Sequence, residues 1–74
     1  MREYRFRLSI PADEYLAYYQ GVAREVVVTL SNGLNLQFPA ENLRPFVSRV
    51  GVFGQFVLRT DDDNKLLSLE RVGD

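Results

Sequence analysis

The chain has 74 residues, a formal net charge of −1, and neither cysteine nor histidine. This composition excludes a disulfide framework and the thiolate and imidazole ligands of the common zinc sites, so no metal or other cofactor is predicted. The length predicts one domain, residues 1–74, with a single core.

The apolar pattern also bears on location. No apolar run approaches the roughly 18 residues that span a membrane, so no membrane association is expected. Residues 1–10 alternate charged with apolar side chains and lack the continuous apolar stretch of a secretory signal. The absence of cysteine fits a reducing compartment, and we therefore expect a soluble, cytoplasmic protein.

The first half of the chain predicts a strand, a short helix and a hairpin. Residues 3–10 alternate polar and apolar side chains, with the period of two that is typical of a half-buried strand. Pro11 ends this strand and suits the first turn of a helix, which ends before Gly21. Strands are expected at Arg24–Leu30 and Leu34–Phe38, because the Asn-Gly pair between them favours a tight hairpin turn.

The second half predicts a helical turn and three further strands. Residues 39–43 suit a single helical turn, and Pro45 holds the residue before it in an extended conformation. A short strand is therefore predicted at Phe46–Ser48. A longer strand follows at Val52–Thr60, and after a polar turn the last strand covers Lys65–Val72.

This order, β-α-β-β-turn-β-β-β with short links, predicts an α+β fold. We expect a strongly twisted, mostly antiparallel sheet, with one short helix after the first strand that covers a face or an open end. The sheet is either open or partly closed into a small barrel, for which SH3-like and Sm-like barrels are the nearest familiar shapes. The side chains expected to be mostly buried are Tyr4, Phe6, Leu8, Leu16, Val26, Val28, Leu30, Phe38, Leu43, Phe56, Leu58 and Leu69.

The arginines are the main candidates for contact with a partner. Between Asn42 and Thr60 there are three arginines and no carboxylate, and two more share the outward face of the first strand. Guanidinium groups bind carboxylates and phosphates through two parallel hydrogen bonds, so these side chains predict a stripe that binds anions or a partner. The alternative is ordinary cross-strand pairing with Glu3, Glu25 and Glu70. The candidates are Arg5, Arg7, Arg44, Arg49 and Arg59.

Three tyrosines at helical spacing form a second candidate set: Tyr15, Tyr18 and Tyr19. They can dock the helix on the sheet, with their hydroxyls at the surface. Alternatively, at least one ring stands out as a stacking platform or as an anchor for a partner.

No pattern in the chain is typical of a catalytic site. The serines have no histidine to act as a base and no G-x-S-x-G elbow around them. Asp13 and Glu14 suit the first turn of a helix better than acid-base work. The acidic run at 61–64 does not match a calcium loop, because Leu66 stands where that loop needs glycine and Val72 where it needs glutamate. The sequence therefore predicts a protein that is not an enzyme.

Three stretches of the chain carry a resemblance to a known family: YLAYYQGVAREVVV, LQFPAENLRPFV and GQFVLRTDDDNKLLSLERV. They are similar to a family of small gammaproteobacterial proteins that is catalogued as a domain of unknown function. The resemblance implies a bacterial, cytoplasmic protein, and it implies no activity, cofactor or catalytic residue.

We expect a small non-catalytic module for binding or protein interaction. Self-association is the interaction that we expect first. A small core without a disulfide or metal, together with sheet edges that a second copy could cover, favours this interpretation. The alternative is weak binding of nucleic acid or another anionic ligand through the arginines. The near-zero net charge disfavours this alternative.

Overall fold

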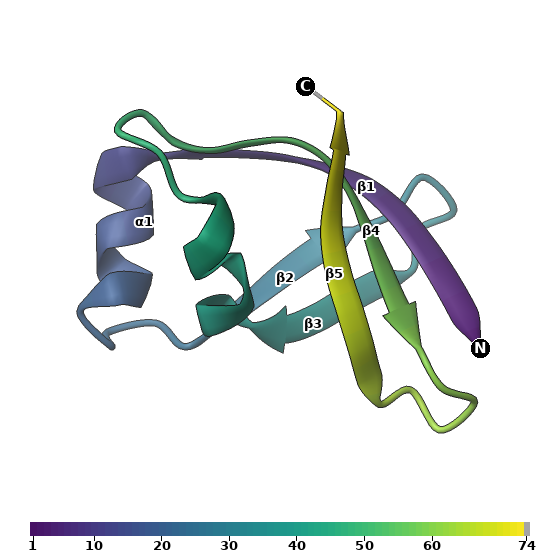
Figure 1. Cartoon of the computed structure of the whole chain (residues 1–74). Coiled ribbons are helices and arrows are strands. Elements are labelled where there is room, and N and C mark those ends of the chain that lie inside the picture. The colour runs from purple at the N-terminus through teal and green to yellow at the C-terminus, as the bar shows by residue number, and fades with distance from the viewer. Residues whose placement is uncertain (74) are drawn as a thin grey trace.

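The computed structural model describes residues 1–73, which form five strands, one α-helix and one 3-10 helix. The α-helix follows the first strand, as predicted, and the 3-10 helix lies between the third and fourth strands (Figure 1). In chain order the elements are β1 (Arg2–Pro11), α1 (Ala12–Tyr19), β2 (Glu25–Thr29), β3 (Asn35–Pro39), η1 (Ala40–Phe46), β4 (Gly51–Thr60) and β5 (Leu66–Gly73).

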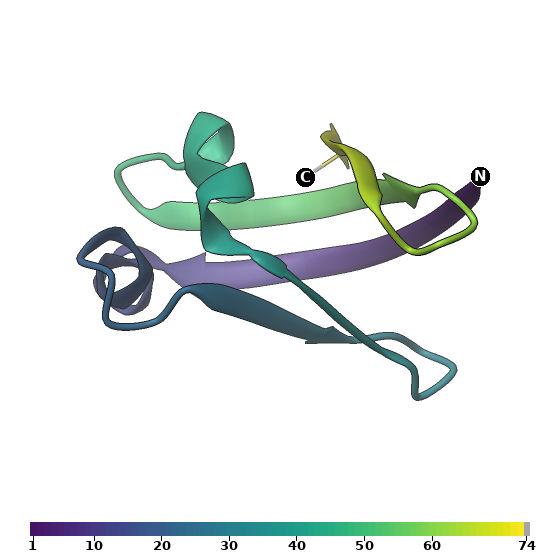
Figure 2. The same ribbon diagram turned by 90° about the horizontal axis from the view of Figure 1, so that it is seen from below.

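The strands form two antiparallel sheets, which confirms the α+β class and the antiparallel pairing. One sheet has three strands in the order β1-β4-β5, and the other is the β2-β3 hairpin. The expectation of a single sheet was wrong, and the strands do not close into a barrel. The cause lies in the pairing of β1, which matches β4 along its whole length, from Arg2 opposite Thr60 to Pro11 opposite Gly51. Because α1 leads the chain away from β1, β2 pairs with β3 instead and forms a second layer (Figure 2).

The core lies between these two layers. Alternate side chains of β1 point inward, and the aligned side chains of β4 meet them, so that Phe6 lies opposite Phe56. The ring of Phe6 lies 6.2 Å from that of Phe56 and 6.0 Å from that of Phe38 on the hairpin, and it thereby joins the two sheets. Of the twelve side chains predicted to be buried, eight are buried: Phe6, Leu8, Val26, Val28, Phe38, Leu43, Phe56 and Leu58. Three others pack partly buried against this core: Tyr4, Leu30 and Leu69.

Leu16 is the one predicted core residue that the structure places at the surface. Its side chain is 48% exposed, whereas its neighbour Tyr15 is 4% exposed. The Tyr15 hydroxyl donates a hydrogen bond to the carbonyl oxygen of Ala40 in η1, at 3.4 Å. Packing against η1 thus sets the rotation of α1, and the pattern within the helix alone does not reveal that neighbour.

The predicted strand at Phe46–Ser48 was also wrong. The 3-10 helix continues through Pro45 to Phe46, and Ser48 makes only an isolated bridge to Gly51. One proline inside a short 3-10 helix removes a single backbone hydrogen bond. The ring of Phe46 packs edge-on against that of Phe56, with centroids 5.3 Å apart. This contact compensates for the lost bond and keeps the segment helical.

The two helices lie side by side at one end of the molecule, as the α1–η1 contacts also show (Figure 1). The loop before β4 also lies at this end, because the backbone N–H of Ala12, at the start of α1, donates a hydrogen bond to the carbonyl oxygen of Val50 at 3.0 Å. The opposite end carries the N-terminus and the β2–β3 turn (Figure 1). The molecule therefore has one helical end and one end built from turns.

Candidate functional site

The five candidate arginines fall into two groups. Arg5, Arg7 and Arg59 lie on the outer face of the three-stranded sheet, because each alternates with inward-pointing residues of its strand. Arg44 lies in η1, and Arg49 lies in the loop before β4, both at the helical end. The sheet face thus unites three of the five candidates.

Two of the sheet-face arginines are engaged by carboxylates. Glu3 accepts a hydrogen bond from Nη2 of Arg5 at 3.0 Å and another from Nε of Arg59 at 3.1 Å. Nη1 of Arg59 also lies 3.0 Å from a carboxylate oxygen of Glu70 on β5. These contacts cover Val57, which is buried on this face. Arg59 therefore pairs across strands with Glu3 and Glu70, and Arg5 pairs with Glu3 on its own strand, whereas Glu25 lies on the other sheet.

The pKa values on this face shift as the contacts require. Hydrogen bonds from Arg59 and then from Arg5 lower the pKa of Glu3 from its ordinary value. The hydrogen bond to Glu70, followed by that to Glu3, raises the pKa of Arg59. Both shifts favour the ionised forms of Glu3 and Arg59 on this face.

The three candidate tyrosines lie together at the helical end. The rings of Tyr15 and Tyr18 are 5.8 Å apart and tilted by 43°. The guanidinium carbon of Arg44 lies 5.7 Å from the centre of the Tyr19 ring, within the range of a cation–π contact. Burial raises the pKa of the Tyr15 hydroxyl, and the nearby charge of Arg44 acts in the opposite direction. The structure therefore brings one candidate arginine together with all three tyrosines.

Two hollows of about 320 and 360 Å³ border this cluster, and both are lined by Tyr15, Tyr19 and Arg44. The first also has charged side chains on its walls, including Arg24, which the sequence did not single out. In the sequence, Arg24 is marked only by its position at the start of the predicted hairpin. In the structure, its carbonyl oxygen accepts a hydrogen bond from the N–H of Ala40 at 2.8 Å.

The second hollow has mostly apolar walls, which include Leu16 and Val47. Both are exposed, as is the Tyr19 ring, at 48%, 40% and 66% respectively. Val50 is exposed as well, and its backbone bond to Ala12 holds it beside the start of α1. We call this surface, defined by Leu16, Tyr19, Arg44, Val47 and Val50, the helical face. It combines apolar area, a stacking ring and a cation.

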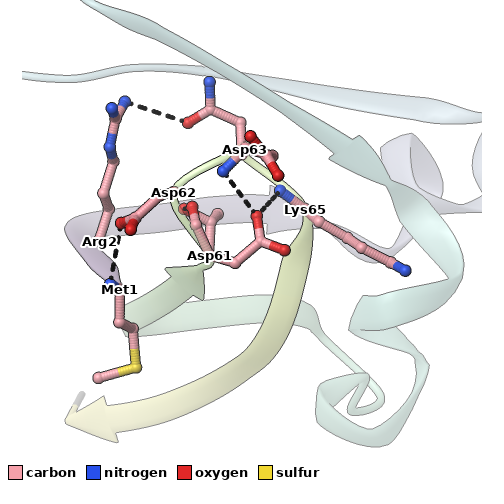
Figure 3. Close-up of polar contacts among 8 residues, drawn as sticks. Met1, Arg2, Asp61, Asp62, Asp63 and Lys65 are labelled. Atoms are coloured by element: carbon pink, nitrogen blue, oxygen red, sulfur yellow. Dashed lines mark hydrogen bonds and ion pairs between the residues drawn. The ribbon is translucent and has the colours of Figure 1, made fainter.

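The acidic turn at 61–64 lies at the end of the molecule away from α1 and η1 (Figure 1), and Figure 3 shows its polar contacts. Oδ1 of Asp61 accepts hydrogen bonds from the backbone N–H groups of Asp63 and Lys65, each at 2.9 Å. Asn64 has a φ of 64°, which allows the chain to reverse. Within residues 1–73, no three histidine, cysteine or acidic side chains are grouped so that they could hold a metal ion. Local hydrogen bonding therefore accounts for the acidic run.

The fold and these surfaces define a small α+β protein of two packed antiparallel sheets with a helical face at one end. The chain belongs to the family described as Protein of unknown function (DUF2835), whose family model matches residues 2–72. No curated protein and no solved structure matches the chain. In residues 1–73 we find no helix with the length and apolar character needed to cross a bilayer.

Proposed function

We propose that the protein is a non-catalytic interaction module that self-associates through its helical face. The observation that carries this proposal is the exposure of Leu16, Tyr19 and Val47 around one apolar hollow. These side chains come from α1 and from the segment after η1, so two parts of the fold present them together. Leu16 and Tyr19 of α1 form one contiguous apolar surface with Val47, and a contiguous exposed apolar surface is typical of a site that a partner covers.

The size of the surface bears on the strength of association. Stable interfaces bury about 800 Å² on each partner, which is about a sixth of the 5155 Å² surface of this chain. The helical face is smaller than the whole helical end, so we expect a weak dimer that forms at micromolar concentrations. Arg44 stacked on Tyr19 supplies the type of side chain that often dominates binding energy at such interfaces.

Sedimentation equilibrium from about 5 to 500 μM tests the proposal. The wild-type chain should show a reversible monomer–dimer equilibrium, and Leu16→Gln should be monomeric because it removes the apolar contact at the centre of the face. The matched control is Val22→Gln, since Val22 is 80% exposed and does not belong to the helical face. A wild-type chain that stays monomeric over this range, or a Leu16→Gln variant that dimerises as well as wild type, would contradict the proposal.

A second candidate function is weak binding of an anionic ligand, including single-stranded nucleic acid, through the arginines. The placement of Arg5, Arg7 and Arg59 on one face supports it. The carboxylates of Glu3 and Glu70 weaken it, because they already pair with Arg5 and Arg59. Titration of a labelled oligonucleotide at 50 mM salt checks this candidate. Binding should weaken in Arg7→Gln and fall steeply with added salt, and no binding at 50 mM salt would sink it.

We further propose that the protein acts in the cytoplasm of a gammaproteobacterium. The absence of cysteine supports a reducing compartment. The resemblance described above supports the bacterial origin.

A further inference from the structure

The two layers of the fold differ in strand number, and this leaves part of the core without a cover. The upper layer has β1, β4 and β5, whereas the lower layer has only β2 and β3. Leu66 and Leu69 of β5, together with Leu36 of β3, pack only partly buried against the core. A third strand beside β3 would lie across from β5 and would cover these side chains.

The free edge of β3 carries backbone groups that such a strand could use. Hydrogen bonds join Leu30 to Leu34 and Arg24 to Ala40, so the hydrogen-bonded pairs of the hairpin are the even-numbered residues of β3. The N–H and C=O groups of Asn35 and Gln37 therefore point away from β2. Among the described strands β3 pairs with β2 alone, so this edge offers two donors and two acceptors to another chain.

A groove of about 290 Å³ runs along this edge. Its floor is apolar and comes from both layers, with Tyr4 of β1, Leu36 of β3 and Leu66 of β5. Its rim is polar and includes Asn35, Gln37 and Asn64. Because side chains alternate along a strand, a strand added to β3 would place every second side chain on this apolar floor.

Arg2 gives the groove its charge. Of the described residues that line the groove, Arg2 is the only one with an ionised side chain. Its Nη1 donates to the neutral amide oxygen of Asn64 at 3.3 Å, at the N-terminal end of β1 (Figure 3). A guanidinium that donates to a neutral amide oxygen can still bind a carboxylate in a charge-assisted pair.

We propose that this groove binds an extended peptide that adds to β3 as an antiparallel or parallel strand. The peptide carries apolar side chains at alternate positions, which lie on the floor formed by Tyr4, Leu36 and Leu66. It also carries a carboxylate, from an acidic side chain or from its C-terminus, that pairs with Arg2. Main-chain hydrogen bonds to Asn35 and Gln37 supply affinity, and the apolar floor together with Arg2 supplies selectivity.

The free edge of β5 is less suited to strand addition. The pairing of β4 with β5 shifts register twice, between Gln55 and Phe56 and between Arg59 and Thr60. Such bulges twist an edge away from regular pairing and blunt it. The β2–β3 pairing runs without a shift from Glu25 opposite Pro39 to Thr29 opposite Asn35, so β3 presents the more regular edge. The Asn42 side chain ends the free edge of β3 on one side, because its Nδ2 donates a hydrogen bond to the Pro39 carbonyl oxygen at 3.1 Å.

A random heptapeptide library displayed on phage tests the proposal, with the full chain immobilised as bait. The matched variants are Gln37→Pro, which removes one outward N–H and leaves the β2–β3 bonds intact, and Gln37→Ala, which keeps that N–H. Peptides enriched on wild type should alternate apolar residues and carry a carboxylate. As synthetic peptides in fluorescence anisotropy, they should bind Gln37→Ala like wild type, bind Gln37→Pro about tenfold more weakly, and bind Arg2→Gln severalfold more weakly.

A second measurement keeps the proposal testable if Gln37→Pro does not fold. Amide hydrogen exchange of the wild-type chain should slow at Gln37 and Asn35 when an enriched peptide is added. The proposal is overturned if no peptide is enriched on the wild-type chain relative to Gln37→Pro, if enriched peptides leave both amides unprotected, or if the edge is covered by a second copy of the chain. The last outcome would appear as peptide-independent protection of Gln37 that grows with protein concentration. Because Leu16 lies outside this groove, Leu16→Gln should bind the peptide normally, which separates this test from that of the helical face.

Discussion

Arg59 lies directly across the β1–β4 pair from Glu3, with its Nε 3.1 Å from Oε2 of the carboxylate. The two side chains therefore form a cross-strand ion pair on the outer face of the sheet. Arg59 uses its Nη1 at the same time for Glu70 on β5, so one guanidinium ties together all three strands. The pair is half-exposed and screened by salt, so its contribution to stability is small.

The first prediction concerns the acid side of the stability curve. Because the folded pKa of Glu3 lies below its ordinary value of 4.5, the ionised form favours the folded state. This stabilisation is present above the unfolded pKa and is lost as the pH falls through the lowered folded pKa. The difference in unfolding free energy between wild type and Glu3→Gln should therefore shrink between about pH 5 and pH 2, measured by urea unfolding at low salt.

The matched control for this prediction is Glu41→Gln, because Glu41 has no ion pair among those of residues 1–73 that we describe. A carboxyl NMR titration of Arg59→Gln should show the pKa of Glu3 moving back toward its ordinary value. An unchanged pKa of Glu3 in that variant would show that the cross-strand pair does not form in solution.

The second prediction concerns Phe56, whose side chain is fully buried and contacts the rings of Phe6 and Phe46. Phe56→Ala leaves a cavity that these rings cannot fill, and it should lower the free energy of unfolding by about 3–5 kcal/mol. Phe56→Leu should cost less, since most of the volume remains. Chemical denaturation monitored by circular dichroism measures both variants.

The comparison for Phe56 is Val22→Ala at an exposed site, which should change stability by less than about 0.5 kcal/mol. Since a chain of this size has a small total stability, Phe56→Ala is expected to be largely unfolded at 37 °C. A melting temperature within a few degrees of wild type would mean that Phe56 does not occupy the centre of the core.

The third prediction concerns Gly51, where β4 begins opposite Pro11. Its φ is +124°, and a Cβ there would overlap the carbonyl oxygen of Ile10. The clash is with backbone, so no side chain can move to relieve it. Gly51→Ala should therefore destabilise the fold by about 3 kcal/mol or more, from strain and overpacking together.

Gly21 provides the matched control, because it also has a positive φ, +79°, but has no atom within 4 Å of a built Cβ. Gly21→Ala should cost only about 1–2 kcal/mol, the conformational penalty alone. Thermal unfolding of the two variants side by side separates the effect of close packing from that of φ. Equal losses would show that β1 and β4 do not approach as closely as described at this point.

Local patterns were sufficient for most of the elements. The alternation in β1 and its end at Pro11 predicted both the strand and its buried face. The Asn-Gly turn predicted the β2–β3 hairpin, and the acidic turn before β5 formed as expected. These features succeed because each depends on neighbours in sequence: side-chain alternation, the fixed φ of proline and the freedom of glycine.

Contacts between distant residues decided the rest. Tyr15 rather than Leu16 faces the core because η1, some 25 residues away in the chain, accepts its hydroxyl. Phe46 stays in the 3-10 helix because its ring packs against the ring of Phe56. The ion pair between Arg59 and Glu3 likewise depends on a long-range contact, the pairing of β1 with β4. The sequence by itself determined most of the strands and turns, since those preferences are local. Only the tertiary structure decided the division into two sheets, the uncovered edge of β3 and the exposed helical face, because each depends on long-range packing that one segment does not encode.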